Sequence, residues 1–264
     1  MAESRDVVVE KRGPIARIVL NRPDKRNAQG IAFTPIMMRA LDEVEQDPEV
    51  AVAILAANGP VFGGGGDLRE IMSVEQADPE WELELVRGYN KLVSRIFHLD
   101  RPIIAAVNGP AIGGGACLAL ACDFAIASVQ AEYHLAFGRI GLSGADMGAA
   151  WLLQRHIGLA RASHLLLTGA SIGANEGKDL GLFAEVVSSE ELDGRVERIA
   201  RAIAAQSRRA TAITKLSLRR SFEAGLEASL AYEAYLQSFA FRSEEHKRRL
   251  AAFLGARKPK EEPK

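Results

Sequence analysis

Two glycine-rich runs contain the residues whose type and spacing could do chemistry in this sequence. The first occupies residues 63–66, and the second occupies residues 113–115. Glycine has no Cβ, so nothing prevents an anion or a carbonyl oxygen from reaching the backbone N–H groups of such a run. Two runs that aim N–H groups at one point could hold a single oxygen between two donors, which is an oxyanion hole.

Each glycine run follows a segment that would hold it in place. Residues 51–57 and 103–107 are short apolar runs typical of buried strands. Asn-Gly-Pro breaks both strands, at residues 58–60 and 108–110. The second run then leads into small apolar residues, 116–121, which predict a buried helix. N–H groups at a helix start have no intrahelical partner and lie at the positive end of the helix dipole.

The remaining pattern predicts an α/β core followed by a helical C-terminal layer. Gly13-Pro14 between two apolar runs predicts a hairpin. We expect domain boundaries at 1–200 for the core, 201–257 for a helical region and 258–264 for a disordered tail. Further strands are expected at 123–127 and 183–187, and helices at 36–44, 80–99, 148–156, 160–167, 192–206, 210–222 and 226–241.

Composition excludes several classes of protein. The chain has 264 residues, 48% hydrophobic and 25% charged, which is ordinary for a globular protein with a core. The formal net charge of −1 lacks the basic footprint of a nucleic-acid binder. No apolar run has membrane-spanning length, and no signal peptide is apparent. Cys117 and Cys122 give no disulfide framework, so a cytoplasmic location is expected.

The paired motifs FGGGGDL (residues 62–68) and AAVNGPAIGGGACLALACDFAIAS (105–128) resemble those of the crotonase (enoyl-CoA hydratase/isomerase) superfamily. NRPDKRNA (21–28) and AAFLGARKP (251–259) are similar to the start and end of that family. The resemblance implies a spiral of repeated β-β-α units, an acyl-CoA thioester substrate and a homotrimer or a hexamer made of two trimers. It implies no permanently bound cofactor and no metal, with coenzyme A arriving as part of the substrate, and a role in fatty acid metabolism.

The resemblance also implies site residues. Gly66 and Gly114 would donate the two N–H groups of the oxyanion hole, which stabilise an enolate-like thioester oxygen. Arg26 would lie beside the phosphates of coenzyme A, which suits a guanidinium. The segment after Asp67 would form a mobile wall over the ligand, and Asp67 itself is expected mainly to brace its loop. The residues expected to bind coenzyme A are Arg26, Ala28, Gly64, Gly66, Asp67, Leu68 and Gly114.

The sequence departs from the family at the two catalytic glutamates. Cys117 stands at the first position, and aligning residues 140–142 places Phe137 at the second. A thiol with a pKa of about 8.5 is a poor base at neutral pH, and a phenyl ring has no acid–base capacity. Asp146 is the remaining candidate for the acid–base group, because several crotonase branches use a carboxylate on this loop. The alternative is that Asp146 only caps the following helix.

The departure leaves the reaction open. The chain is expected to be an acyl-CoA enzyme of the hydratase/isomerase type, a lyase or an isomerase, with Gly66, Gly114 and Asp146 as catalytic groups. The alternatives are an acyl-CoA hydrolase or decarboxylase on the same fold, or a thioester binder that catalyses no reaction. A Rossmann or P-loop protein fits poorly, because neither glycine run has G-x-G-x-x-G spacing or a following G-K-[ST].

Overall fold

The computed structural model describes residues 6–74 and 78–255, and the predicted tail at 258–264 lies outside them. The chain divides into two compact units, with the boundary between Ile203 and Ala204. Within the described ranges, no helix combines the length and the apolar character needed to cross a bilayer.

A six-stranded sheet forms the centre of the first unit, with strand order β1-β2-β3-β4-β6-β9. β1 and β2 are antiparallel, and every other neighbouring pair is parallel. The β1–β2 turn contains Gly13 at φ +61°, a conformation that glycine adopts without strain. The predicted hairpin and buried strands are confirmed. The strands are Val7–Arg12 (β1), Ile15–Leu20 (β2), Val52–Ala57 (β3), Ile103–Val107 (β4), Phe124–Ser128 (β6) and Glu185–Val187 (β9).

A second sheet is made of three short strands. It consists of Pro110–Ile112 (β5), Glu132–His134 (β7) and Ser171–Gly173 (β8), in the order β5-β7-β8. Isolated bridges join Gly63 to Ala111 and Gln29 to Gly66, so the first glycine run pairs with both β5 and the segment after β2. β4 leads into β5 and β6 into β7, so successive turns of the chain add to both sheets. This is the predicted spiral of the crotonase fold.

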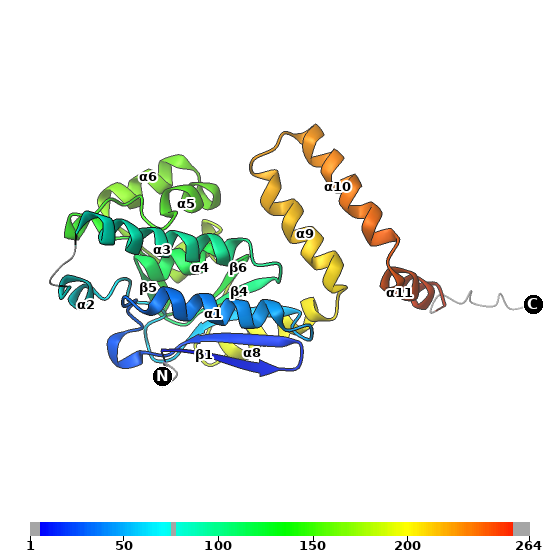
Figure 1. Ribbon diagram of the computed structural model, residues 1–264, viewed down its shortest axis with the longest axis horizontal. Helices are drawn as coiled ribbons and strands as arrows, with labels where there is room; N and C mark the ends of the chain where they lie inside the picture. Colours follow the sequence, from blue (N-terminus) through cyan, green and yellow to red (C-terminus); the bar gives the residue numbers. More distant parts are fainter. Residues whose placement is uncertain (1–5, 75–77, 256–264) are drawn as a thin grey trace, which may run out of the picture. The chain divides into compact units, whose positions relative to one another are not determined.

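Helices cover the core of this unit, and α1 and α3 lie next to each other in Figure 1. α4 is buried along its whole length, which explains its glycine, alanine and leucine composition. The helices are Phe33–Gln46 (α1), Leu68–Met72 (α2), Pro79–Phe97 (α3), Gly114–Ala121 (α4), Ala149–Ile157 (α5), Leu159–Thr168 (α6), Ala174–Asp179 (α7) and Leu192–Ala204 (α8), with short 3-10 turns at Pro23–Lys25 (η1) and Phe137–Ile140 (η2).

The apolar residues of α3 recur at three- and four-residue steps, as in an amphipathic helix, but only part of this stripe is core. Its C-terminal half is buried, from Tyr89 to Phe97. Its N-terminal half is not, because Leu83 and Val86 are 47% and 42% exposed. Val86 instead lines a cavity, so this half of the helix forms a cavity wall rather than core.

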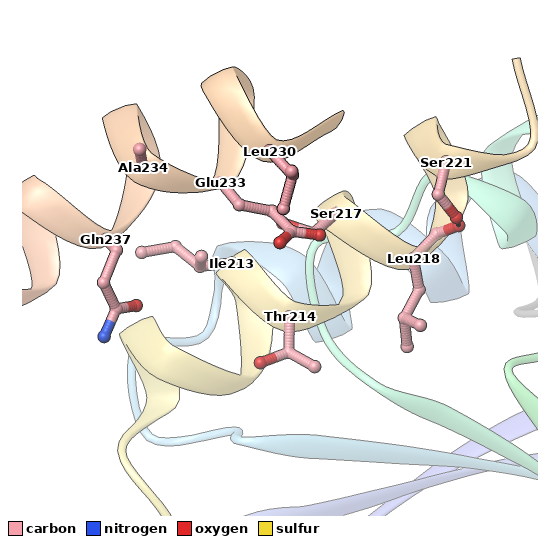
Figure 2. Close-up of a pocket in the computed structure, with 9 residues that line it drawn as sticks. All are labelled: Ile213, Thr214, Ser217, Leu218, Ser221, Leu230, Glu233, Ala234 and Gln237. Atoms are coloured by element: carbon pink, nitrogen blue, oxygen red, sulfur yellow. Dashed lines mark hydrogen bonds between the residues drawn. The ribbon is translucent and has the colours of Figure 1, made fainter. Parts of the chain in front are cut away.

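The C-terminal unit contains Arg208–Ser221 (α9), Leu226–Phe241 (α10) and Glu244–Gly255 (α11). α9 and α10 pair as a helical hairpin (Figure 1), and the groove between them is shown in Figure 2. Ser207 caps α9 by accepting from the Ala210 N–H at 3.3 Å, and its hydroxyl donates to Glu245 of α11 at 2.7 Å. The predicted α9 and α10 are confirmed, whereas α11 had not been predicted as a separate helix.

Candidate active site

A cavity of about 680 Å³ in the first unit lies where the two glycine runs meet. Its walls come from both runs, from α2 and α3, from η2 and from the loop that ends at Met147. Most of these walls are apolar side chains. The side chains of Gln29 and Asp146 are among the few polar groups in the lining. Such a concave, mostly apolar site with a few polar groups is typical of a small-molecule site.

Close backbone contact holds the two glycine runs together. A Cβ built on Gly63 would lie 2.9 Å from the Gly115 Cα, and one on Gly115 would overlap the Gly63 carbonyl. A Cβ on Gly65 would lie 3.1 Å from the Ile112 carbonyl oxygen and 3.7 Å from the Gly114 nitrogen. These positions therefore need glycine for packing. The sequence pattern alone does not distinguish this packing requirement from a role in binding.

The N–H groups of Gly66 and Gly114 have no backbone partner within residues 6–74 and 78–255. The β-bridge between Gln29 and the first glycine run uses the neighbours of Gly66 instead. The Gln29 N–H donates to the Gly65 carbonyl at 2.7 Å, and the Asp67 N–H donates to the Gln29 carbonyl at 2.8 Å. Both glycines line the cavity, and Gly114 is the first residue of α4. Two unpaired donors therefore lie in the wall of one cavity.

Asp67 braces the loop between the first glycine run and α2. Its carboxylate accepts from the Glu70 N–H at 3.3 Å and thereby caps α2. Arg22 lies 3.3 Å from the same carboxylate and donates to the Ala28 carbonyl at 2.9 Å. These contacts tie the loop to the segment that precedes α1, and Asp67 is not among the residues that line the cavity.

The other residues expected to bind coenzyme A divide into two groups. Gly64 and Leu68 line the cavity beside Gly66 and Gly114. Arg26 is exposed and adopts a left-handed backbone conformation with φ 55°, and neither it nor Ala28 lines the cavity. Arg26 nevertheless adjoins the first glycine run, because its carbonyl oxygen would lie 2.9 Å from a Cβ on Gly64.

Asp146 lies in the cavity wall and does not cap a helix with its side chain. Its carboxylate accepts from the Met147 N–H at 2.8 Å. α5 begins at Ala149, three residues after Asp146, and it follows Gly148 at φ +74° without a side-chain cap. The helix-cap interpretation of Asp146 is therefore wrong, and Asp146 is one of the residues that line the cavity.

Cys117 and Phe137 occupy buried positions without acid–base capacity. Cys117 is fully buried in α4, and its thiol donates to the Asp146 carbonyl across 3.8 Å. Burial raises the pKa of the Cys117 thiol far above its ordinary value, and the nearby Asp146 carboxylate adds to the shift. The Phe137 ring lies 3.4 Å from a Cβ built on Gly113.

The structure adds three residues to the site. Met147, Tyr89 and Gln29 all line the cavity. The Tyr89 hydroxyl donates to the Gln29 and Gly30 carbonyls at 3.0 and 3.3 Å, and burial raises the pKa of Tyr89 to about 12. Tyr89 also belongs to the apolar stripe of α3, so its spacing alone does not distinguish it from a core residue. For Gln29, a polar residue directly after the Asn-Ala of NRPDKRNA was the one available signal.

Comparisons with known proteins agree with this fold. The enoyl-CoA hydratase/isomerase family model matches residues 10–263. "Probable enoyl-CoA hydratase echA12" of Mycobacterium bovis is 35% identical over 237 residues, covering 88% of this chain and 81% of that protein. The 1,2-epoxyphenylacetyl-CoA isomerase of Escherichia coli is 33% identical, covering 93% of this chain and 94% of the isomerase.

A solved structure extends the likeness to three dimensions. The crystal structure of an enoyl-CoA hydratase from Bacillus anthracis superposes with a TM-score of 0.91 at 28% identity, covering 97% of this chain and 98% of that one. The chain therefore belongs to the enoyl-CoA hydratase/isomerase family of the crotonase superfamily.

Proposed function

We propose that this protein is an acyl-CoA thioester enzyme of the enoyl-CoA hydratase/isomerase type in which one carboxylate, Asp146, moves the proton. The observation that carries the proposal is the composition of the cavity. It contains two unpaired backbone donors from two glycine runs, together with an aspartate that does not cap the adjacent helix.

The Gly66 and Gly114 N–H groups would receive the thioester oxygen. Charge develops on that oxygen when a proton leaves the neighbouring carbon, because the electron pair of the broken C–H bond moves into an enolate. Fixed N–H dipoles stabilise this charge without reorganising, and one such donor is typically worth about 3–4 kcal/mol of barrier. Since Gly114 is the first residue of α4, the helix dipole adds to the same effect.

Asp146 would supply the acid–base step. Its carboxylate takes the proton from the carbon beside the thioester and returns it to another carbon of the acyl chain, so the charge balances and a double bond moves. Such a shuttle needs one carboxylate, whereas the familiar hydration route uses two. Cys117 and Phe137 cannot replace those two, since the thiol is buried with a raised pKa.

The nucleotide part of coenzyme A would extend toward the exposed loop that contains Arg26. The carbonyl of Arg26 adjoins Gly64, and Gly64 lines the cavity, so the loop borders the site. An exposed guanidinium next to a thioester site suits the phosphate groups of the cofactor moiety.

A panel of acyl-CoA esters tests the proposed reaction. Enoyl, dienoyl and hydroxyacyl esters would be incubated with the protein, and the products would be separated by chromatography. We expect a change in double-bond position to be faster than addition of water to crotonyl-CoA. Failure of every ester to react, with binding retained, would favour a thioester binder instead. Release of free coenzyme A would favour a hydrolase.

Cys117→Ala is expected to leave turnover within about twofold of the wild-type value. The thiol is fully buried, and its raised pKa keeps it protonated at neutral and moderately alkaline pH. The same property predicts slow alkylation by iodoacetamide in the folded protein up to about pH 9, as measured by mass spectrometry. Loss of activity in Cys117→Ala, with an unchanged melting temperature, would show that the catalytic group has been assigned to the wrong residue.

We also propose that the C-terminal unit joins copies of this chain into a trimer or a hexamer. α9, α10 and α11 expose many large apolar side chains, including Leu218, Phe222, Leu226, Tyr235 and Phe241 at 49–71%. Light scattering at micromolar concentration should give three or six times the chain mass. Leu226→Glu should reduce that mass, whereas Leu167→Glu, an exposed residue of α6, should not. A monomeric wild-type protein would contradict the proposal.

A further inference from the structure

The side-chain amide of Gln29 lies buried in the wall of the cavity with its amino group unpaired. Gln29 is 1% exposed, and its Nε2 has no hydrogen-bond partner among the residues described. An unsatisfied buried donor typically costs about 1–3 kcal/mol, and most buried polar groups in folded proteins are paired. The burial of this unpaired amino group therefore needs a physical explanation.

The backbone of Gln29 is fixed firmly against the first glycine run. Its N–H donates to the Gly65 carbonyl at 2.7 Å. Its carbonyl accepts from the Asp67 N–H at 2.8 Å and from the Tyr89 hydroxyl at 3.0 Å. Three hydrogen bonds thus fix the backbone from which the side chain starts.

The side chain reaches across to the second glycine run. A Cβ built on Gly114 would overlap Gln29 Oε1 and would lie 2.8 Å from Met147 Sδ. The amide therefore lies beside Gly114, on the side where a side chain would project if residue 114 had one. Since Cβ atoms tilt toward the N-terminus of a helix, this is also the end of α4 that opens to the cavity.

The amide can present either a donor or an acceptor to the cavity. The terminal torsion of glutamine has a broad, roughly twofold energy profile, so a half-turn exchanges the oxygen and the amino group at low cost. The thioether sulfur of its neighbour Met147 is only a weak hydrogen-bond acceptor. Tyr89 already donates its hydroxyl to backbone carbonyls. The missing partner must therefore come from the contents of the cavity.

We propose that the Gln29 amide recognises an oxygen substituent on the acyl chain, and so selects thioesters that carry a hydroxyl or keto group close to the thioester carbonyl. The inference rests on the proposed function, because it takes the thioester oxygen to bind at Gly66 and Gly114. A hydroxyl group satisfies the amide in both of its orientations, since it donates and accepts. A plain alkyl chain leaves the amide unpaired, and sites with unpaired polar groups discriminate strongly against such ligands.

The test compares 3-hydroxybutyryl-CoA with butyryl-CoA by isothermal titration calorimetry. The wild-type protein should bind the hydroxy ester about 10–100-fold more tightly, as expected for a polar group that gains its only partner. Gln29→Met keeps the length of an unbranched side chain and removes its hydrogen bonds. This variant should bring the ratio of the two affinities close to one, because it weakens the binding of the hydroxy ester only. Gln46→Met makes the same chemical change on the exposed end of α1 and should keep the wild-type ratio.

Several results would overturn the inference. Equal affinities of the two esters in the wild-type protein would do so, with the proposed function left intact. An affinity ratio of the two esters that stays at the wild-type value in Gln29→Met would also overturn the inference. Equal weakening of both esters would show that the amide acts on the thioester oxygen instead. Binding of neither ester to the folded wild-type protein would contradict the proposed function itself.

The stability of the variant provides an independent check. Because Gln29→Met removes an unpaired polar atom, the melting temperature without ligand should not fall. If Gln29→Met does not fold, Gln29→Leu makes the same test. The ratio of the two ester affinities in the wild-type protein tests the preference for an oxygen substituent without any variant.

Discussion

Asp146→Asn is expected to lower turnover of the best acyl-CoA ester by about 10²–10⁴-fold, the usual contribution of one general acid–base group. Asparagine keeps the size and the oxygen that accepts from the Met147 N–H, so the loop should be preserved. It cannot hold and return a proton at neutral pH. The Kd for the ester should therefore change little, while kcat falls.

Glu82→Gln is the matched comparison for Asp146→Asn. Glu82 also lines the cavity, but it is exposed on α3. We expect this variant to keep most of the wild-type turnover, and steady-state assays on both variants measure the difference. Full activity in Asp146→Asn, or a larger loss in Glu82→Gln, would remove Asp146 from the mechanism.

Gly66→Pro is expected to lower kcat by about 10²–10³-fold, the typical effect of deleting one donor from an oxyanion hole. Proline removes the backbone N–H of residue 66 and restricts its φ to about −65°. Because the carbonyl charge is larger in the transition state than in the bound ester, most of the loss should appear in kcat rather than in Kd.

Gly66→Ala separates the loss of the donor from the gain of a side chain. Among the described residues, a Cβ at this position would meet Ile71 Cδ1 at 3.4 Å and Leu68 Cδ2 at 3.9 Å, and alanine keeps the N–H. Its turnover should stay within about tenfold of the wild-type value, and melting temperatures confirm that both variants fold. If proline and alanine have the same effect, the Gly66 N–H is not a catalytic donor.

The larger elements could be predicted because their patterns are long. The β1–β2 hairpin and the buried strands β3 and β4 have clear turn residues and clear apolar runs. β5 and β8 have three residues each, too few to show alternation. Pro110 had been interpreted as a strand break, yet it is the first residue of β5, where a missing N–H is tolerated.

The site could be predicted only as far as local sequence reaches. The two glycine runs identified the cavity, because backbone geometry follows from glycine itself. Whether Asp146 caps α5 depended on where that helix begins, a boundary that the pattern placed at 148 and the structure places at Ala149. Gln29 was missed because its burial results from contacts with residues far along the chain, such as Tyr89 and Gly114.

The infrared spectrum of a bound thioester tests the central claim most directly. Butyryl-CoA labelled with ¹³C at the carbonyl would be added to the wild-type protein, and the difference spectrum between labelled and unlabelled ester would isolate one C=O band. Polarisation of that carbonyl by the Gly66 and Gly114 N–H groups should shift the band of the bound ester to lower frequency than in water, and Gly66→Pro should reverse part of the shift. A bound ester whose band stays at the frequency found in water would contradict the account.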